Sequence, residues 1–483
     1  MPLHQVPPVK PSERPVESVN PEQLLDREKG LSRQLSARQL TMIALGGAIG
    51  TGLFLGTGLS VPIAGPAIII TYIIGALIAV LLMGALSEMA VVHPTAGSFG
   101  VYAEIYINPW AGFSVRYAYW FAQVVAVGSE VIAASIYMRK WVPEEKVPPF
   151  VWVIVFSLVM VYINARSVGN FGEFEYWFAM IKVVTIVAFI VVGALLLFGV
   201  GNSHPAGIGN FKSYDGFFPK GWSGVWLAIP FVIFSYIGTE IVAVTAGEAK
   251  DPDKAIPKAL RTMVGRLIIF YVGAVSILLA LLPWNQIGAK GSPFVHVFET
   301  IHIPGAEHLM NFVVLTATLS SLNTNLYLTT RMMFSLSRGG YAPAPIGTLS
   351  KSGVPLRALL VSTGGLAVAA LLTWRFQGRD AFAFMIGVAL FGALFVWLMI
   401  FVTHLFFRPA WLKSGRALPI KMIGYPITSI LGIIAMLAIM VTTYWAPDQA
   451  FNKALPVGLP FLGLITLAYL VWRWRFRRSS KDS

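Results

Sequence analysis

The sequence contains no cysteine among its 483 residues. Disulfides, thiolate metal ligands and thiol nucleophiles are therefore excluded for this chain. Charged residues are also scarce, at 12% of the chain against about a quarter in soluble domains. Apolar residues reach 56% and the mean hydropathy is +0.71. These values indicate an all-α membrane protein that crosses the bilayer many times, because about 20 apolar residues form one spanning helix.

Acidic residues are outnumbered by basic ones: 22 Asp and Glu stand against 36 Lys and Arg, a formal net charge of +14. A nucleic-acid partner would need the basic residues gathered on a soluble face. Here they stand between apolar segments, so we expect a lipid bilayer as the partner and no nucleic acid. With the N-terminal tail placed inside, 26 of the 36 lie on the cytoplasmic side and nine outside. This bias predicts an integral protein of the plasma (bacterial inner) membrane with both termini in the cytoplasm.

Long apolar segments follow a polar start. Residues 1–40 contain six prolines and mixed charges, which predicts a disordered cytoplasmic tail. The rest of the chain predicts about twelve transmembrane helices and a second cytoplasmic tail at 475–483. In chain order, the spans are expected at about 41–60, 66–89, 112–137, 149–166, 174–200, 224–247, 263–283, 306–335, 357–375, 380–405, 424–446 and 457–474.

Four glycines interrupt the first span within residues 46–52. Each lowers helix propensity by about 1 kcal/mol relative to alanine and lets the backbone leave helical geometry. Unpaired backbone groups in hydrocarbon cost several kcal/mol, so such a break persists only where it lines a cavity or meets a polar ligand. Gly46 and Gly50 also fit the small-xxx-small pattern of helix packing. The glycines point all around the helix, however, and this favours a binding site.

The sixth span contains a second interruption. The tripeptide Ile-Gly-Thr of residues 49–51 recurs at 237–239, after Pro230. The two copies lie five spans apart, so their helices run in opposite directions through the membrane. Interrupted helices at matching positions of two oppositely oriented halves predict an inverted-repeat transporter with its substrate near the midplane. The chain then divides into a first repeat at 41–200, an inverted second repeat at 224–405, and two extra helices within 424–474.

Several motifs resemble one known family. Residues 40–54 are similar to the opening of the amino acid transporter family, within the amino acid-polyamine-organocation (APC) superfamily. Residues 88–99, 234–240 and 247–259 resemble the same family, and the similarity runs from about residue 33 to about 410. The resemblance implies a LeuT-like fold: a five-plus-five inverted repeat with helices 1 and 6 broken, followed by two extra helices. It also implies proton-coupled import of amino acids by alternating access.

The resemblance implies a binding mode for a zwitterionic amino acid. In the family, the first broken helix offers free backbone N–H groups to the carboxylate, and the second offers carbonyls to the ammonium. The carboxylate positions in this sequence are Ala48, Ile49, Gly50, Thr51 and Gly52. The ammonium positions are Phe234, Ser235 and Ile237. The candidates for the side-chain pocket, between the third, sixth, eighth and tenth spans, are Gln123, Val127, Phe234, Gly238, Thr239, Glu240 and Asn323.

Charged residues inside spans are rare and are functional hypotheses by default. Glu130 lies deep in the third span, and Glu240 and Glu248 lie on the inner half of the sixth. The alternative for each is a structural ion pair or a side chain that snorkels to the interface. We favour that alternative for Glu248 and leave it open for Glu130. For Glu240, beside the second break, we expect a role in ammonium recognition or proton coupling.

Lys182 lies about eight residues, or about 12 Å, into the fifth span. Residues 178–184 resemble the position where proton-coupled members of the superfamily carry a lysine and sodium-coupled relatives hold a sodium ion. A medium of low dielectric constant disfavours a charged ammonium, which suits a group that exchanges protons. Our hypothesis is that charged Lys182 bridges the first and eighth spans. Loss of its proton to the cytoplasm would loosen the inner gate.

The sequence leaves some alternatives open. An exchanger of the same fold is not separated from a proton symporter by these motifs. An enzyme would need a nucleophile with its base, or metal ligands, inside the spans, and no HExxH motif occurs. A channel would usually need a ring of repeated polar residues from several subunits. We expect no metal and no cofactor apart from the proton as coupling ion.

The substrate and the oligomeric state are also open. The expected pocket is mostly apolar and small around Gly128, Ser129 and Gly238, which favours neutral or hydrophobic amino acids. Glu130 and Glu240 keep a cationic amino acid possible, and a γ-amino acid fits as well.

Overall fold

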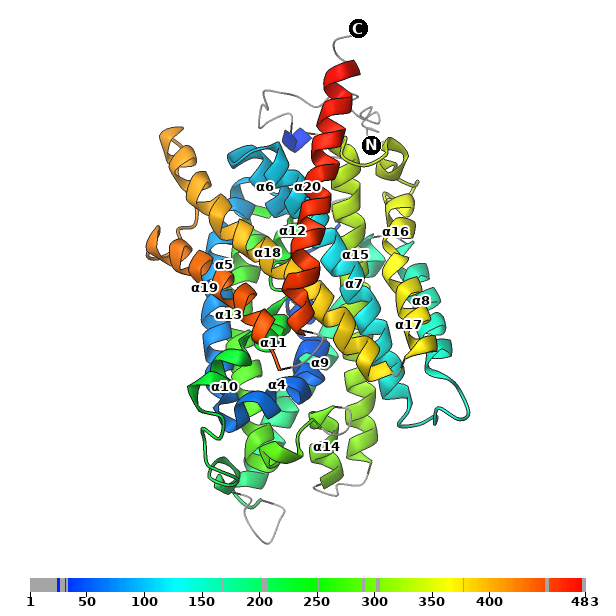
Figure 1. Ribbon diagram of the computed structural model, residues 1–483, viewed down its shortest axis with the longest axis vertical. Coiled ribbons are helices and arrows are strands. Elements are labelled where there is room, and N and C mark those ends of the chain that lie inside the picture. The colour runs from blue at the N-terminus through cyan, green and yellow to red at the C-terminus, as the bar shows by residue number, and fades with distance from the viewer. Residues whose placement is uncertain are drawn as a thin grey trace.

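The computed structural model consists of helices that run in both directions along one long axis (Figure 1). It describes residues 24–26, 31, 34–166, 168–200, 207–250, 252–288, 292–300, 305–376, 378–447 and 451–479. Across these residues there is no β-strand, only an isolated bridge between Leu35 and Ala249. Eight helical stretches of the described chain are long and apolar enough to cross a membrane, and two shorter apolar helices accompany them. The predicted all-α membrane class is confirmed.

Each of the twelve expected spans is helical, and the first and sixth are broken. In chain order they are α2 (Ala37–Ala48) with α3 (Thr51–Phe54) and α4 (Gly56–Ala64); α5 (Ile68–Val92); α7 (Pro109–Met138); α8 (Pro149–Asn164); α9 (Val168–Leu197); α10 (Gly221–Leu227) with α11 (Ile229–Tyr236) and α12 (Ile241–Thr245); α13 (Pro252–Leu281); α15 (Ala306–Arg338); α16 (Leu356–Ser362) with α17 (Gly364–Arg375); α18 (Gly378–Lys413); α19 (Ile427–Thr442); and α20 (Ala454–Ser479). Two further helices, α6 (Ser98–Tyr106) and α14 (Pro293–Thr300), lie in connections at opposite ends of the bundle (Figure 1).

The N-terminal tail is shorter than the expected 1–40. Helix α2 begins at Ala37, where Ser36 and Gln39 form a capping box that satisfies free N–H groups of the first turn. Leu35 is fully buried; its N–H donates to the Glu248 carbonyl (3.0 Å), and its own carbonyl accepts from the Lys250 N–H (2.9 Å). The hydropathy pattern missed this start because the first turn of α2 is polar. Residues 1–23, 27–30 and 32–33 lie outside the described residues.

Other helix ends also extend beyond the apolar segments. Helix α13 begins at Pro252, eleven residues before the expected span at 263–283, and α18 continues to Lys413. Helix α20 reaches Ser479, so part of the expected tail at 475–483 is helical. The reason is the same in each case: hydropathy locates the part of a helix that lies in hydrocarbon, whereas the helix itself continues into polar residues.

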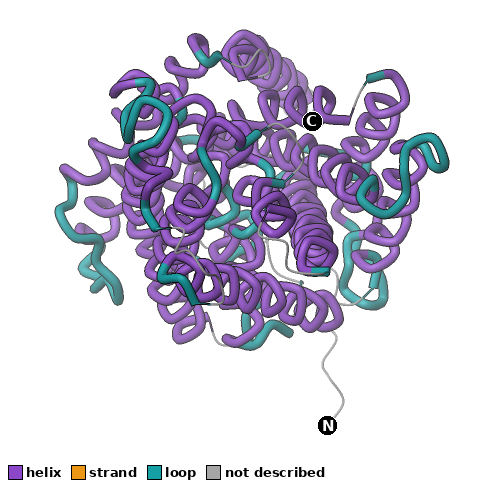
Figure 2. The backbone as a smooth tube through the Cα atoms, turned by 90° about the horizontal axis from the view of Figure 1, so that it is seen from below, coloured by secondary structure: helices purple, strands orange, loops and turns teal. Residues whose placement is uncertain are grey.

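The broken helices lie among the other spans in the interior of the bundle. Helix α2 packs against α9 and α13, while α7 packs extensively against α15 and α18. Figure 2, seen along the long axis, shows several helices end-on and side by side. Outer helices expose apolar side chains, for example Leu158 (67% exposed) and Leu464 (65% exposed), as membrane-spanning helices do.

Candidate functional site

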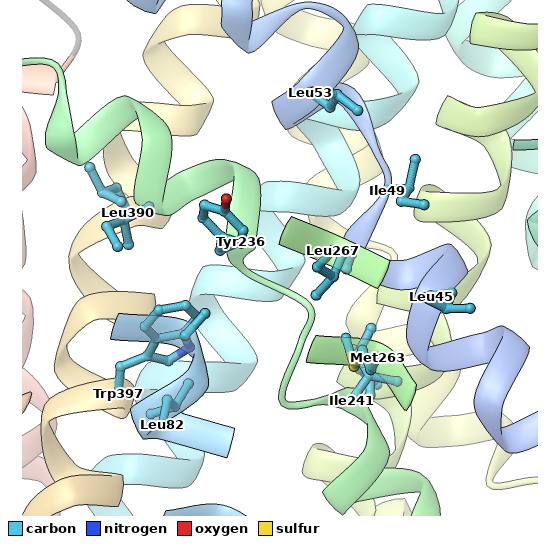
Figure 3. Packing of buried hydrophobic residues seen from close by; sticks show 14 of the residues in the cluster. Leu45, Ile49, Leu53, Leu82, Tyr236, Ile241, Met263, Leu267, Leu390 and Trp397 are labelled. Atoms are coloured by element: carbon cyan, nitrogen blue, oxygen red, sulfur yellow. The ribbon is translucent and has the colours of Figure 1, made fainter. Parts of the chain in front are cut away.

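The first break separates α2 from α3. Ile49 (φ −87°, ψ 89°) and Gly50 (φ −132°, ψ −154°) leave helical geometry, and Figure 3 shows this stretch between Leu45 and Leu53. In a continuous helix, each carbonyl accepts a hydrogen bond from the N–H four residues later. The break removes these partners from the last carbonyls of α2. Because an unpaired carbonyl is costly in the interior, other groups must replace them.

Side chains and backbone from three other segments meet these carbonyls. Lys182 Nζ of α9 donates to the Gly46 carbonyl oxygen at 2.5 Å. The Tyr271 hydroxyl of α13 donates to the Ala48 carbonyl. The Gly47 carbonyl lies against Gly238 of the second break, where an added Cβ atom would come within 2.6 Å of the oxygen. The first break is thus held by α9, α13 and the second break.

The second break lies between α11 and α12, and Figure 3 shows it between Tyr236 and Ile241. Gly238 has φ 106°, a conformation that favours glycine, and its N–H donates to Glu240 Oε2 at 3.0 Å. Glu240 is fully buried and accepts two more hydrogen bonds, from the Tyr119 hydroxyl (3.1 Å) and from Trp397 Nε1 (3.3 Å). Glu240 therefore ties the break to α7 and α18.

The two breaks touch each other. Ser235 Oγ donates to the Gly52 carbonyl at 2.8 Å, and an added Cβ atom at Gly52 would lie 2.6 Å from Ser235 Cα. The Tyr271 hydroxyl lies 2.7 Å from the Ser235 carbonyl as well as against the Ala48 carbonyl. The structure therefore brings the predicted carboxylate and ammonium positions side by side.

Glu130 lies at the first break. Its Oε1 accepts hydrogen bonds from Thr51 Oγ1 (2.9 Å) and Ser321 Oγ (3.0 Å), so it joins α7, α3 and α15. Glu130 Oε2, Thr239 Oγ1 and Gln123 Oε1 are buried and have no hydrogen-bond partner among the residues the structure describes. Buried polar atoms are normally paired, so these three atoms are suited to the polar groups of a ligand.

Lys182 is fully buried and interacts electrostatically with Glu175 and Glu130. Its contact with the first span is direct, through the Gly46 carbonyl. Its connection with the eighth span, α15, runs through Glu175, which accepts hydrogen bonds from Ser320 Oγ and, at 3.3 Å, from Asn323 Nδ2. Lys182 therefore contacts the first break and interacts with two carboxylates.

The other predicted residues are placed as follows. Ile49 and Val127 are fully buried, and Phe234 and Ile237 are half-buried. Asn323 is bonded to Glu175 and, at 2.7 Å, to Asn164 Nδ2 of α8. Since two residues turn a helix by about 200°, it faces away from the side of α15 that carries Ser321.

Glu248 lies apart from the breaks. It pairs with Arg331 Nε at 2.8 Å, so the structural ion pair favoured for it is confirmed. Arg331 also lies over the Tyr327 ring, 3.7 Å from its centroid.

A profile of the amino acid permease family matches residues 39–483. The chain belongs to the amino acid permease family. It is 41% identical over 450 residues to the gamma-aminobutyric acid permease of Bacillus subtilis (strain 168), a match that covers 93% of this chain and 95% of that protein. It is 39% identical over 440 residues to the amino-acid permease RocC of the same organism, covering 89% and 93%. A third relative there, named "Probable threonine/serine transporter YbxG", is 37% identical over 449 residues, covering 92% and 96%.

Family membership fixes the general activity. This amino acid permease is an integral membrane protein of a family that transports amino acids, as its motifs predicted, and it is not an enzyme. The sequence motifs did not identify five residues that the structure places beside the breaks or beside Lys182: Tyr119, Glu175, Tyr271, Ser321 and Trp397. Only Glu175 carried a signal, because it precedes Lys182 by two helical turns and therefore shares its helix face.

Proposed function

We propose that this permease imports amino acids by proton symport and alternating access, with both termini in the cytoplasm. The substrate carboxylate binds at the N–H groups of residues 50–52, which donate to no backbone carbonyl among the described residues. Of the expected positions, Ile49 already donates its N–H to the Leu45 carbonyl, and the Thr51 N–H also interacts with the Glu130 carboxylate. The ammonium binds at the second break, beside Phe234 and Ile237. The Phe234 and Ser235 carbonyls each already have a donor nearby, the Ile237 N–H at 3.3 Å and the Tyr271 hydroxyl at 2.7 Å.

The observation that carries the proposal is the contact between Lys182 Nζ and the Gly46 carbonyl, at 2.5 Å. This carbonyl is one that the first break leaves without its helical partner. A charged ammonium forms a stronger hydrogen bond to it than a neutral amine does. The protonation state of Lys182 thereby determines how firmly α2 is held against α9.

This contact supports a coupling scheme. While Lys182 is protonated, α2 stays in place and the cytoplasmic side stays closed. When Lys182 loses its proton to the cytoplasm, α2 is released and the substrate leaves inward. The moving units in this scheme are the two repeats, residues 41–200 and 224–405, which meet at the two breaks.

Two glutamates have separate roles in this scheme. Glu130 accepts from Thr51 at the first break, so it senses occupancy of the carboxylate site and contributes to proton coupling. Glu240 accepts from the Gly238 N–H and holds the second break in its left-handed turn. The two oxygens of Glu240 already accept three hydrogen bonds. Glu240 therefore supports the ammonium site indirectly, by holding the backbone of Gly238 in place.

A binding screen identifies the substrate. The names of the relatives mention gamma-aminobutyric acid, threonine and serine, so the screen uses these and the other standard amino acids. The readout is the melting temperature of the purified protein in detergent. A ligand at a hundredfold excess over its Kd stabilises the folded state by about 2.7 kcal/mol.

The coupling test uses proteoliposomes loaded at pH 7.5 and diluted to pH 6 outside, with the screened substrate. We expect accumulation that a protonophore abolishes. Lys182→Gln should lower this accumulation at least tenfold, while Lys351→Gln, a change at an exposed lysine, should leave it intact. Full accumulation by Lys182→Gln would overturn the role of Lys182. Uptake that needs internal amino acid but no pH gradient would identify an exchanger instead.

A further inference from the structure

Glu175 is a fully buried carboxylate that the transport scheme above does not use. It precedes Lys182 by seven residues on α9, so the two side chains lie on the same face of the helix. Side chains on a helix tilt toward its N-terminus, which directs Lys182 toward the turn that carries Glu175. The spacing corresponds to about 10 Å along the helix axis, a gap that two long side chains can bridge.

Both groups meet the same residue of the first broken helix. Lys182 Nζ binds the Gly46 carbonyl, and an added Cβ atom at Gly46 would lie 2.7 Å from Glu175 Oε1. The carboxylate therefore packs directly on the backbone of Gly46. A movement of α2 that frees Lys182 also uncovers Glu175.

The charges around Lys182 come from two helices. Glu130 faces it from α7 and Glu175 from its own helix, α9. The groups of α15 that act on Glu175 are the neutral side chains of Ser320, Asn323 and Thr324. Helix α2 contributes the Gly46 carbonyl, which accepts from Lys182. Glu130 is bonded to Thr51 at the first break, whereas Glu175 lies against Gly46, the residue that Lys182 binds.

A polar route continues from Glu175. Asn323 Nδ2 donates to Glu175 Oε2 at 3.3 Å, and Asn323 Oδ1 accepts from Asn164 Nδ2 at 2.7 Å. Asn164 is the last residue of α8, two residues before the exposed Arg166. The charge bias places this connection in the cytoplasm. Polar side chains thus extend from Glu175 to the cytoplasmic end of the bundle.

We propose that Glu175 is the proton acceptor for Lys182. When Lys182 leaves the Gly46 carbonyl, an N–H bond of its ammonium breaks and an O–H bond forms on Glu175, so that both groups become neutral. Glu175 then gives this proton to water at the cytoplasmic end and becomes a carboxylate again. Lys182 takes its next proton from the outer side. This inference rests on the proposed proton symport.

The test compares Glu175→Gln with the wild-type protein. Glutamine keeps the shape of the side chain and one acceptor oxygen, replaces the other acceptor with an amide donor, and cannot take up the proton. We expect unchanged substrate binding in the thermal-shift assay and unchanged counterflow exchange, because exchange needs no proton release. Substrate-driven acidification inside proteoliposomes, read with a trapped pH dye, should fall at least tenfold at every external pH. Ser320→Ala, which removes a hydrogen bond but keeps the carboxylate, should still acidify.

The outcomes separate the two proposals. A wild-type protein that exchanges without acidification refutes proton symport and, with it, the acceptor role. A wild-type protein that acidifies, with a Glu175→Gln variant that acidifies equally, refutes the acceptor role alone. If the variant still couples but only at more acidic external pH, Glu175 serves as a counter-charge for Lys182 and the acceptor role is overturned.

A second variant covers the case in which Glu175→Gln fails to bind substrate. Glu175→Asp keeps a carboxylate on a side chain shorter by one methylene group. We expect it to bind substrate and to restore measurable acidification. Binding without any acidification would overturn the proposal.

Discussion

At the scale of single residues, one hydroxyl joins the two helix breaks. The Tyr271 hydroxyl lies against the Ala48 carbonyl of the first break and 2.7 Å from the Ser235 carbonyl of the second. A hydroxyl has one proton, so the two carbonyls share a single donor. The Tyr271 ring stacks on Tyr236, with 4.8 Å between centroids, and this packing holds the hydroxyl in place.

Removing this hydroxyl should weaken substrate binding. In Tyr271→Phe the ring packing stays, but the one donor that the two buried carbonyls share is lost, at a cost of about 1–3 kcal/mol. We expect a lower melting temperature and a Kd for substrate raised about tenfold, equivalent to about 1.4 kcal/mol. The matched control is Tyr236→Phe, which loses a hydrogen bond to the Tyr72 carbonyl, outside the two breaks. Equal affinities for both variants would show that Tyr271 has no special role in binding.

At the scale of helices, the sequence predicted both breaks, the first from its four glycines and the second from the repeated Ile-Gly-Thr tripeptide after Pro230. The expected interruptions at 46–52 and 237–239 correspond to non-helical residues at 49–50 and 237–240. Glycines that point all around a helix lower its propensity on every face, and this property is visible in the sequence alone. The exact non-helical residues depend on which neighbouring groups bind the freed backbone, and this requires the structure.

The part of the site that depends on contacts between helices far apart in the sequence could not be predicted. Lys182 was predicted because a charge inside a span is rare, and it does contact the first break. Tyr271 and Trp397 were missed because tyrosine and tryptophan are common in apolar spans, and only the packing shows which of them meet a break. Asn323 was expected in the substrate pocket, and the structure shows it bonded to Glu175 and Asn164. The sequence does not show which face of α15 points toward the breaks.

The second break should not tolerate a side chain at Gly238. A left-handed φ costs a non-glycine residue about 1–2 kcal/mol, and the new Cβ atom would lie 2.6 Å from the Gly47 carbonyl. We expect Gly238→Ala to lower transport at least tenfold and to lower the melting temperature. Gly265→Ala, in helix α13 with no atom within 4 Å of an added Cβ, should leave transport intact. Wild-type transport by Gly238→Ala would show that the left-handed turn is dispensable.

At the scale of the whole molecule, the distribution of basic residues predicts the orientation in the membrane. Connections on alternate sides of the spans differ strongly in their Lys and Arg content, and the richer side is expected in the cytoplasm. Figure 1 shows α10 and α14 at one end of the bundle and α6 at the other. By the charge bias, the end with α10 and α14 faces outward.

The lack of cysteine makes this orientation directly testable, because any introduced thiol is the only one in the protein. Ser223, Ser352 and Ser414 are exposed; the first lies in α10, and the other two lie in connections on the basic side. We expect a membrane-impermeant maleimide to label Ser223→Cys in intact cells, but Ser352→Cys and Ser414→Cys only after permeabilisation. The wild-type protein is the control and should stay unlabelled throughout. The reverse labelling pattern would place the basic connections outside the cell. The polar route from Glu175 would then end outside, which would contradict the proposed release of protons to the cytoplasm.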